Sequence, residues 1–535
     1  MTSNEVYTGA GVSATLVPEM DYDIGMQLGT TAITHQYITS GGANSKGFRY
    51  KNTASGNSSA VDRTTISWGV DADGGSAHVA NRLPTDIYKG CTAIVNNHTA
   101  ANASPTTQVL LIKSNSPYQI TFNQEISSAD TDIITLTILG FGTPAFSPAV
   151  TDSKNNLLSD NWLGLVNTIT PPTIDAEMKQ VNLALGGTRN FGIQYKGAES
   201  YGSASIDVSL NNGSWLYYAL GNMTFTATQQ VNGGGSPVTL AMSQENSKVY
   251  YDNTNKTFHR RESGALSPPQ KYGTADTSML KLSADSKIDY TFTESESGNL
   301  PSFALEITNE KGNVTDANYF QDANDENMFS RIFTGCQVNT FTMNFEEGQE
   351  VKATIDAVTR RGYDSLPNYI PKRKVRTPSS LFNYNAEADN LPFMFSDGHI
   401  EAFGQTLGKV KSGSLTITNN ITPQRFIGNY DRSIISAHTT GQRLYDIQLN
   451  LQITDRTVFD ELRNQGEISA SNIVITFDKN DTANTDKITF TLKDYIVQSV
   501  DIPFPDDKGM LDVALTLSAR ALHECKYHGK WIILG

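Results

Sequence analysis

The tightest group of potential metal ligands lies near the end of the sequence. His523, Cys525 and His528 fall close together, and imidazole and thiolate are the ligands that zinc prefers. Their spacing matches no established zinc site, and no second pair of ligands accompanies them. The pattern therefore predicts structural residues and no metal site.

Two acid-rich runs offer carboxylates that could bind calcium or act as a pair in glycoside hydrolysis. Residues 501–507 and 322–326 contain these carboxylates, but neither run has the loop glycine and ligand spacing of a calcium-binding loop. The sequence also lacks the nucleophile elbow of serine hydrolases, the phosphate-binding loop and the His-Glu-x-x-His motif. We therefore expect solvated turns, no cofactor and no enzymatic activity.

The overall charge argues against general binding to nucleic acid. The 535 residues carry a formal net charge of -14, and binding to phosphates requires clustered Lys and Arg. The three cysteines, Cys91, Cys336 and Cys525, are far apart, which predicts reduced and buried thiols. The first residues do not resemble a secretion signal and no apolar run could span a bilayer, so we expect a soluble protein made in the cytoplasm and no membrane partner.

The elements that would position these residues are mainly strands. Thr, Ser, Asn and Gly are abundant, which is typical of short strands joined by polar turns. Apolar and polar residues alternate over residues 443–454, so this segment predicts a strand with one buried face. The period then changes over residues 455–465, which predicts a short helix ending before Gly466. Further strands are expected around residues 473–477, 488–492 and 511–517.

A hairpin is expected to close an N-terminal domain. Phe341, Met343 and Phe345 share one face, a turn follows at 346–350, and apolar residues alternate again from Val351. The Pro-containing and basic stretch that follows predicts a linker at residues 371–380. The chain thus divides into a domain at 1–370 and a second domain at 381–535. Gly/Ser/Asn-rich regions at about 70–160 and 225–295 are interpreted as long loops or an inserted β subdomain.

Several segments in order resemble the tail tube proteins of long-tailed bacteriophages. In the first half, a strand beginning Gly187-Thr-Arg189 precedes a second strand and a short helix that ends at Gly221. In the second half, a strand ending in Asn419-Asn420 precedes the strand that begins Gly441-Gln-Arg443. The resemblance covers roughly residues 165–225, 295–362 and 395–520.

The resemblance implies a structural virion protein that stacks in rings around a channel for phage DNA. The repeated order of motifs implies tandem tail-tube β-sandwich or barrel domains, each with a short flanking helix. Two copies per chain imply a trimeric ring, whereas one copy with an added domain implies a hexamer. Other tail proteins, namely the tape measure, the baseplate and the terminator, are the implied partners, in a virion tail assembled in the host cytoplasm.

Within the segments that carry the resemblance, we expect four polar residues to mediate contacts between subunits. Arg189 and Arg443 could form salt bridges within a ring, although an exposed Arg at a strand end would contribute under about 1 kcal/mol. Asn419 and Asn420 are the other two candidates. Acidic residues lining the channel would repel DNA phosphates and allow passage without specific binding.

Two other functions stay open at this point. Aromatic residues such as Trp68, Trp162 and Tyr201 in a polar β-rich chain also suit a carbohydrate-binding or adhesion module. A baseplate or distal tail protein with the same tube fold differs mainly in copy number. Assembly state separates these functions, because a tube protein forms rings or polymers whereas a binding module stays a small oligomer.

Overall fold

A computed structural model confirms the mainly β fold. Every strand pair is antiparallel in the residues whose structure is described. These residues are 12–18, 22–27, 33–34, 49–50, 64–67, 88–98, 106–116, 119–126, 133–138, 165–181, 192–228, 237–242, 249–252, 257–262, 265–267, 280–281, 288–295, 300–310, 328–364, 391–407, 409–427, 434–452, 472–479, 486–501 and 512–529. Among them, no helix is long and apolar enough to cross a membrane.

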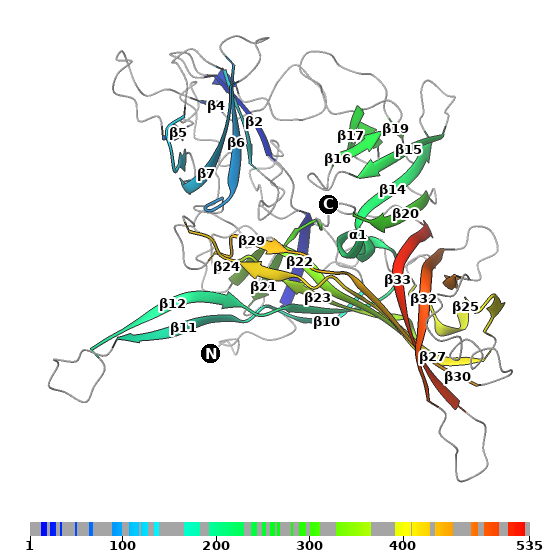
Figure 1. Ribbon diagram of the computed structural model, residues 1–535. Coiled ribbons are helices and arrows are strands. Elements are labelled where there is room, and N and C mark those ends of the chain that lie inside the picture. Colours follow the sequence, from blue (N-terminus) through cyan, green and yellow to red (C-terminus); the bar gives the residue numbers. More distant parts are fainter. Residues whose placement is uncertain are drawn as a thin grey trace, which may run out of the picture.

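Eight strands form one continuous sheet at the centre of the molecule (Figure 1). Apolar residues alternate with polar ones along these strands, so one face is buried while the other is open. In spatial order the strands are β10 (Leu165–Thr170), β13 (Ala204–Ser209), β23 (Lys352–Val358), β22 (Met328–Glu346), β27 (Val410–Thr418), β30 (Leu444–Gln452), β33 (Asp512–Gly529) and β32 (Lys487–Asp501).

The sheet consists of two groups of four strands with the same arrangement. Numbered along the chain, the first group contains β10, β13, β22 and β23, and its strands lie in the order first, second, fourth, third. The second group, β27, β30, β32 and β33, lies in the same order. The groups join where Thr340–Glu346 of β22 pair with Ser412–Thr418 of β27, so the sheet runs unbroken across the expected domain division.

Strand β22 also belongs to a second sheet, because it bends sharply at Gly335. Its first part pairs with β21 (Phe303–Glu310) and β24 (Arg361–Asp364), and β21 pairs with β1 (Val12–Pro18). Its later part pairs with β23 and β27 in the central sheet. Gly335 has a φ of +66°, a conformation that favours glycine, and an added Cβ would lie 2.5 Å from Cβ of Arg360.

The helix α1 (Ser214–Leu220) lies on one side of the central sheet and is enclosed in the core. Six of its seven residues are buried, and it lies against β22, β14 (Gly221–Thr228) and β20 (Ile288–Glu294). The Asn212 side chain accepts a hydrogen bond from the Ser214 backbone amide at 2.9 Å, and Gly221 ends the helix with a φ of 107°. Tyr218 packs edge-to-face on Phe303 with ring centroids 5.1 Å apart.

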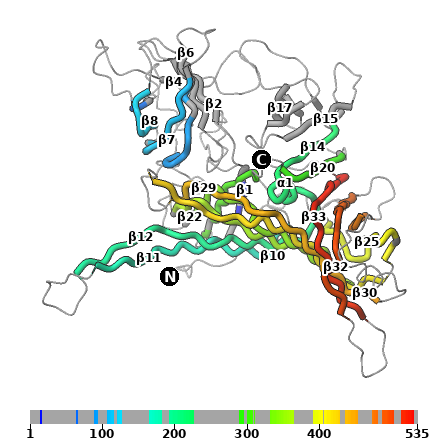
Figure 2. The backbone as a smooth tube through the Cα atoms, viewed as in Figure 1, coloured from blue at the N-terminus to red at the C-terminus, as the bar shows by residue number. Residues whose placement is uncertain are grey.

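The remaining strands extend the central sheet through β20 and β31 (Ile473–Asp478) or form smaller sheets around it (Figure 2). A six-stranded sheet contains β2 (Tyr22–Gln27), β9 (Ile133–Ile138), β6 (Thr92–His98), β7 (Thr106–Ser116), β8 (Gln119–Phe122) and β5 (Thr65–Ser67), in that order. A second ladder continues from β14 through β15 (Pro237–Met242), β16 (Val249–Asp252), β17 (Thr257–Glu262), β18 (Ala265–Ser267) and β19 (Leu280–Lys281). Three pairs of strands are smaller: β3 (Ile33–Thr34) with β4 (Arg49–Tyr50), β11 (Ile174–Val181) with β12 (Ile193–Tyr201), and β28 (Thr422–Gln424) with β29 (Ala437–Thr439). Strand β31 pairs with β25 (Gly398–Ala402), and β25 pairs with β26 (Gln405–Thr406). The 3-10 turn η6 (Phe395–Asp397) precedes β25.

Most elements expected from local patterns are present. The strand expected at 443–454 is β30, the predicted hairpin is β22 with β23, and the later strands are β31, β32 and β33. The helix expected at 455–465 and the linker at 371–380 lie outside the described residues. The division into domains at 1–370 and 381–535 stays a prediction.

Candidate assembly and channel surfaces

The open face of the eight-stranded sheet is covered by short polar side chains, and we call it the polar face. Alternation buries Phe341, Met343 and Phe345 of β22 on the α1 side, which leaves Asn344 and Glu346 on the polar face. Strand register aligns such residues in rows across the sheet. One row runs Asn344, Ser414, Gln448 and Thr516, and the next runs Glu346, Ser412, Asn450 and Ala514.

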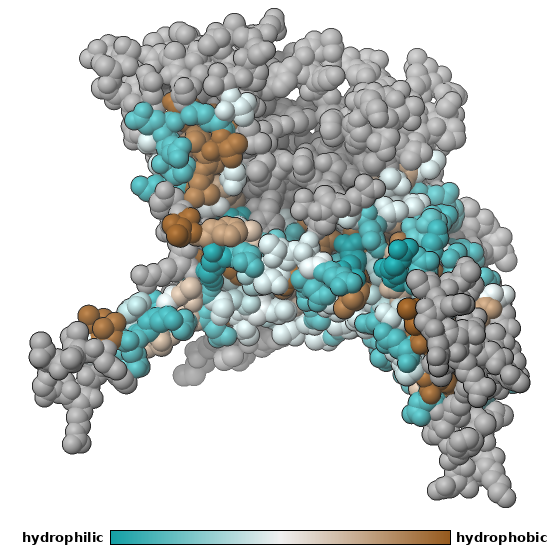
Figure 3. Space-filling view, viewed as in Figure 1, coloured by the Kyte–Doolittle hydropathy of each residue, from teal (hydrophilic) through white to brown (hydrophobic). Residues whose placement is uncertain are grey.

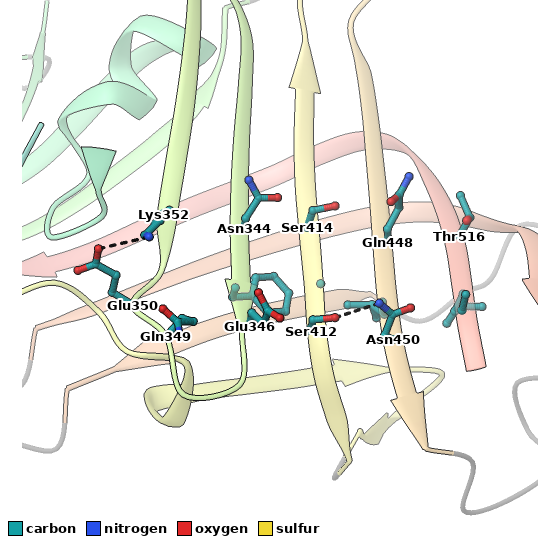
Figure 4. A pocket seen from close by; sticks show the side chains of 15 residues that line it. Asn344, Glu346, Gln349, Glu350, Lys352, Ser412, Ser414, Gln448, Asn450 and Thr516 are labelled. Atoms are coloured by element: carbon teal, nitrogen blue, oxygen red, sulfur yellow. Dashed lines mark hydrogen bonds and ion pairs between the residues drawn. The ribbon is translucent and has the colours of Figure 1, made fainter. Parts of the chain in front are cut away.

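Part of the polar face is hollowed into a groove of about 610 Å³ (Figure 4). Asn450 donates a hydrogen bond to the Ser412 hydroxyl at 2.9 Å, and Lys352 lies 3.8 Å from Glu350. Phe345 contributes to the lining, but its side chain is 2% exposed and belongs to the core. The groove thus offers hydroxyls, amides and carboxylates, with no exposed aromatic ring among its lining residues.

Carboxylates outnumber basic groups on the polar face. Alternation places Asp207, Asp356, Asp446 and Glu346 there, and none of them has a basic partner within the described part of the chain. The basic side chains are paired instead: Lys352 with Glu350, Lys411 with Asp512 at 2.8 Å, and Arg520 with Asp494 near one edge. A surface of this sign repels polyanions.

Each edge of the eight-stranded sheet has a stretch without a strand partner among the described residues. Strand β10 pairs with β13 on one side only. At the other edge, β31 covers β32 only as far as Leu492, so residues 493–501 pair with β33 alone. Unpaired edges present backbone donors and acceptors that readily pair with another chain.

The β11–β12 hairpin projects from the body of the molecule (Figure 1) and ends in an apolar patch (Figure 3). Val181 and Ile193 pair across its far end, and Tyr195 lies on the same face. These side chains are 40%, 53% and 44% exposed, respectively. A two-stranded ribbon is marginally stable alone in water, so such a patch indicates a surface that another molecule covers.

Three of the four predicted contact residues lie in the described structure, and two of these belong to one buried cluster. Asn419 is 2% exposed and donates hydrogen bonds to the carbonyls of Ala219 at 3.1 Å and Val338 at 2.9 Å. Its side-chain oxygen accepts a bond from Nε of Arg443 at 2.6 Å. Asn420 is exposed, adopts a φ of 50° and donates to the Gln442 carbonyl at 2.6 Å. Arg189 lies outside the described residues.

Glu294 completes this cluster, and no local pattern in the sequence singled it out. Its carboxylate accepts hydrogen bonds from the Tyr445 hydroxyl at 2.5 Å and the Leu522 amide at 3.0 Å, and it lies 3.9 Å from Arg443. Burial, together with the Glu294 carboxylate, raises the pKa of Tyr445. These contacts lie within one chain, so a contact of Arg443 or Asn419 with another subunit stays a prediction.

The possible zinc ligands point in different directions. Cys525 is fully buried on β33, and burial raises the pKa of its thiol. His523 is exposed, whereas His528 contacts Asp289 at 2.7 Å. Within the described residues, no group of three or more His, Cys, Asp or Glu side chains is arranged to hold a metal.

Comparison with known protein families places the chain in a family. The model of the phage tail tube protein family matches residues 141–519, which include the whole eight-stranded sheet up to Ala519 of β33. A search of curated proteins gave no significant match. Because the match covers most of the sequence, the chain is a structural protein that belongs to the phage tail tube protein family.

Proposed function

We propose that the protein is the major tail tube subunit, which assembles into stacked rings around a channel for phage DNA. The observation that carries this proposal is the eight-stranded sheet, with its polar face and its two unpaired edges. If β10 of one copy pairs with β32 of the next, the sheets form a closed barrel and no edge remains exposed. The polar face would then line the channel.

The matched strand order of the two groups favours a trimer over a hexamer. Each group of four strands is interpreted as one copy of a tube domain, so a chain supplies two copies. Three chains then give a ring with six similar groups. The projecting β11–β12 hairpin would cover its apolar patch against a neighbouring copy, since tube proteins assemble with themselves.

The remaining parts of the proposal follow from this placement. Unpaired carboxylates on the polar face would keep DNA from binding as it passes. The tape measure, baseplate and terminator proteins would be the other partners, in a virion tail assembled in the host cytoplasm. The protein would act without catalysis or cofactor.

The same surfaces bear on the two alternative functions, a carbohydrate-binding module and a baseplate or distal tail protein. Sugar-binding sites commonly stack a ring on an exposed aromatic side chain, and the lining of the groove offers none. This observation disfavours a carbohydrate-binding module. A baseplate or distal tail protein would share the fold but would stop at a single ring.

Assembly of edge variants tests the proposal. Negative-stain microscopy of the purified chain should show rings or hollow tubes with a central channel. Changing Ile496, which is 43% exposed near the β32 edge, to lysine should weaken this assembly, because the side chain would lose apolar contact with β10 of the next copy. Val109→Lys on the six-stranded sheet, where the side chain is 66% exposed, is the matched control and should still assemble. Compact monomers of the native chain in all conditions would refute the proposal, and discrete single rings would favour the distal tail protein.

A further inference from the structure

The six-stranded sheet is inserted into the path of the core. Strand β1 pairs with β21 in the core, the chain then forms the strands between Tyr22 and Ile138, and it returns to the core at β10. The family match begins at residue 141, after the last of these strands. The six-stranded sheet therefore lies outside the part of the chain that the family model matches.

This sheet has a core of its own. Its buried side chains include Val95, Leu110, Ile112, Ile120 and Phe122, and none of them belongs to the main hydrophobic cluster. In Figure 1 the sheet lies on the side of the central sheet that carries α1, away from the polar face. The arrangement is that of a separate module placed on the core.

One buried side chain reaches from the core to this module. Arg360, 5% exposed, lies in the turn between β23 and β24. Its Nη2 donates a hydrogen bond to the Gly90 carbonyl at 2.6 Å, and its Nη1 lies 4.0 Å from Sγ of Cys91. Both residues immediately precede β6 of the module.

The same side chain is fixed from the core side. Its Nε donates to the Ile435 carbonyl at 2.8 Å, and its backbone amide bonds the Thr334 carbonyl at 3.1 Å. The Ile435 amide bonds the Arg360 carbonyl at 3.1 Å. Gly335 lies beneath the Arg360 side chain, and the absence of a Cβ there leaves room for it. A planar guanidinium can serve several acceptors in fixed directions, which an amine cannot do.

We propose that Arg360 is the latch that docks the inserted six-stranded module onto the tail tube core, and that module and core are separate folding units joined at this side chain. The latch rests on contacts within one chain and is independent of ring formation. Loss of the guanidinium should release the module while the core sheet stays folded.

Hydrogen exchange followed by mass spectrometry of the full chain tests the latch. In Arg360→Met, peptides covering residues 88–98 and 434–438 should exchange at least about tenfold faster, whereas peptides of β13 and β23 should keep their native rates. Arg360→Lys keeps the positive charge but loses the planar guanidinium that reaches several acceptors. It should therefore show most of the increase in exchange rate. Arg520→Met, which removes an exposed arginine on β33, is the matched control and should exchange like the native chain.

Three outcomes would overturn the proposal. Unchanged exchange at residues 88–98 would mean that Arg360 does not hold the module, and equally faster exchange in β13 and β23 would mean that it stabilises the whole fold. If Arg360→Met does not fold, urea denaturation of the native chain tests whether the module and the core are separate folding units. The module and the core should then unfold at different urea concentrations, and a single shared transition would refute separate units.

Discussion

At the scale of single residues, buried polar side chains connect segments that are far apart in the sequence. Asn419 bonds to Ala219 and Val338, and its oxygen accepts from Arg443. An amide buried without such partners would cost about 1–3 kcal/mol, so these bonds favour one relative placement of helix, β22 and β30. Asn419 therefore has a structural role within a single chain.

His438 gives the chain a residue-scale dependence on pH. Burial, and then the charge of Arg360, lower the pKa of His438 from 6.5 to about 4. The histidine binds a proton more tightly in the unfolded chain than in the folded chain. The contribution of neutral, buried His438 to stability is therefore fully present above pH 6.5 and is lost as the pH falls toward 4. The free energy of unfolding should drop by roughly 1–3 kcal/mol across this window.

Urea denaturation at several pH values checks this expectation against His438→Asn. Asparagine can still donate to Gln337, whose Oε1 lies 3.1 Å from the histidine Nδ1, but it does not titrate. The native chain should lose more stability than the variant between pH 6.5 and 4. Parallel curves for the two proteins would show that carboxylates alone cause the acid sensitivity.

At the scale of elements, the bend in β22 decides how two sheets share one strand. Gly335→Ala should destabilise the protein by roughly 2–4 kcal/mol, because the new Cβ would meet Arg360 in a conformation unfavourable for alanine. Gly348 has a similar φ of +75° and open space around it, so Gly348→Ala is the matched control at about 1 kcal/mol. Denaturation midpoints measure the difference, and equal losses would show that the contact with Arg360 is unimportant.

At the scale of the whole molecule, the sign of charge on the polar face is expected to control DNA passage. Glu346→Lys with Gln448→Lys should make assembled tubes retain single-stranded DNA at low salt in a nuclease-resistant form, whereas native tubes should release it. Val109→Lys with Glu125→Lys on the six-stranded sheet changes the charge equally and should leave any bound DNA open to nuclease. Nuclease-resistant DNA in both variants, or in neither, would contradict a channel lined by the polar face.

Short-range patterns in the sequence predicted the local elements. Alternation of apolar and polar residues identified β30 and the β22–β23 hairpin, because the period of a strand depends only on neighbouring residues. The resemblance to tube proteins likewise placed the helix that ends at Gly221. The mainly β class and the family followed from these signals together.

Only the tertiary structure decided which strands pair and which polar side chains meet. Many strands share the same alternation, so the pairing of β22 with β27 is not encoded in either segment alone. Glu294 meets Tyr445, and Arg360 meets Gly90, across long stretches of chain that leave no periodic trace. Local sequence thus determined the strands and their buried faces, whereas the polar face, its two edges and the Arg360 junction arose from long-range packing.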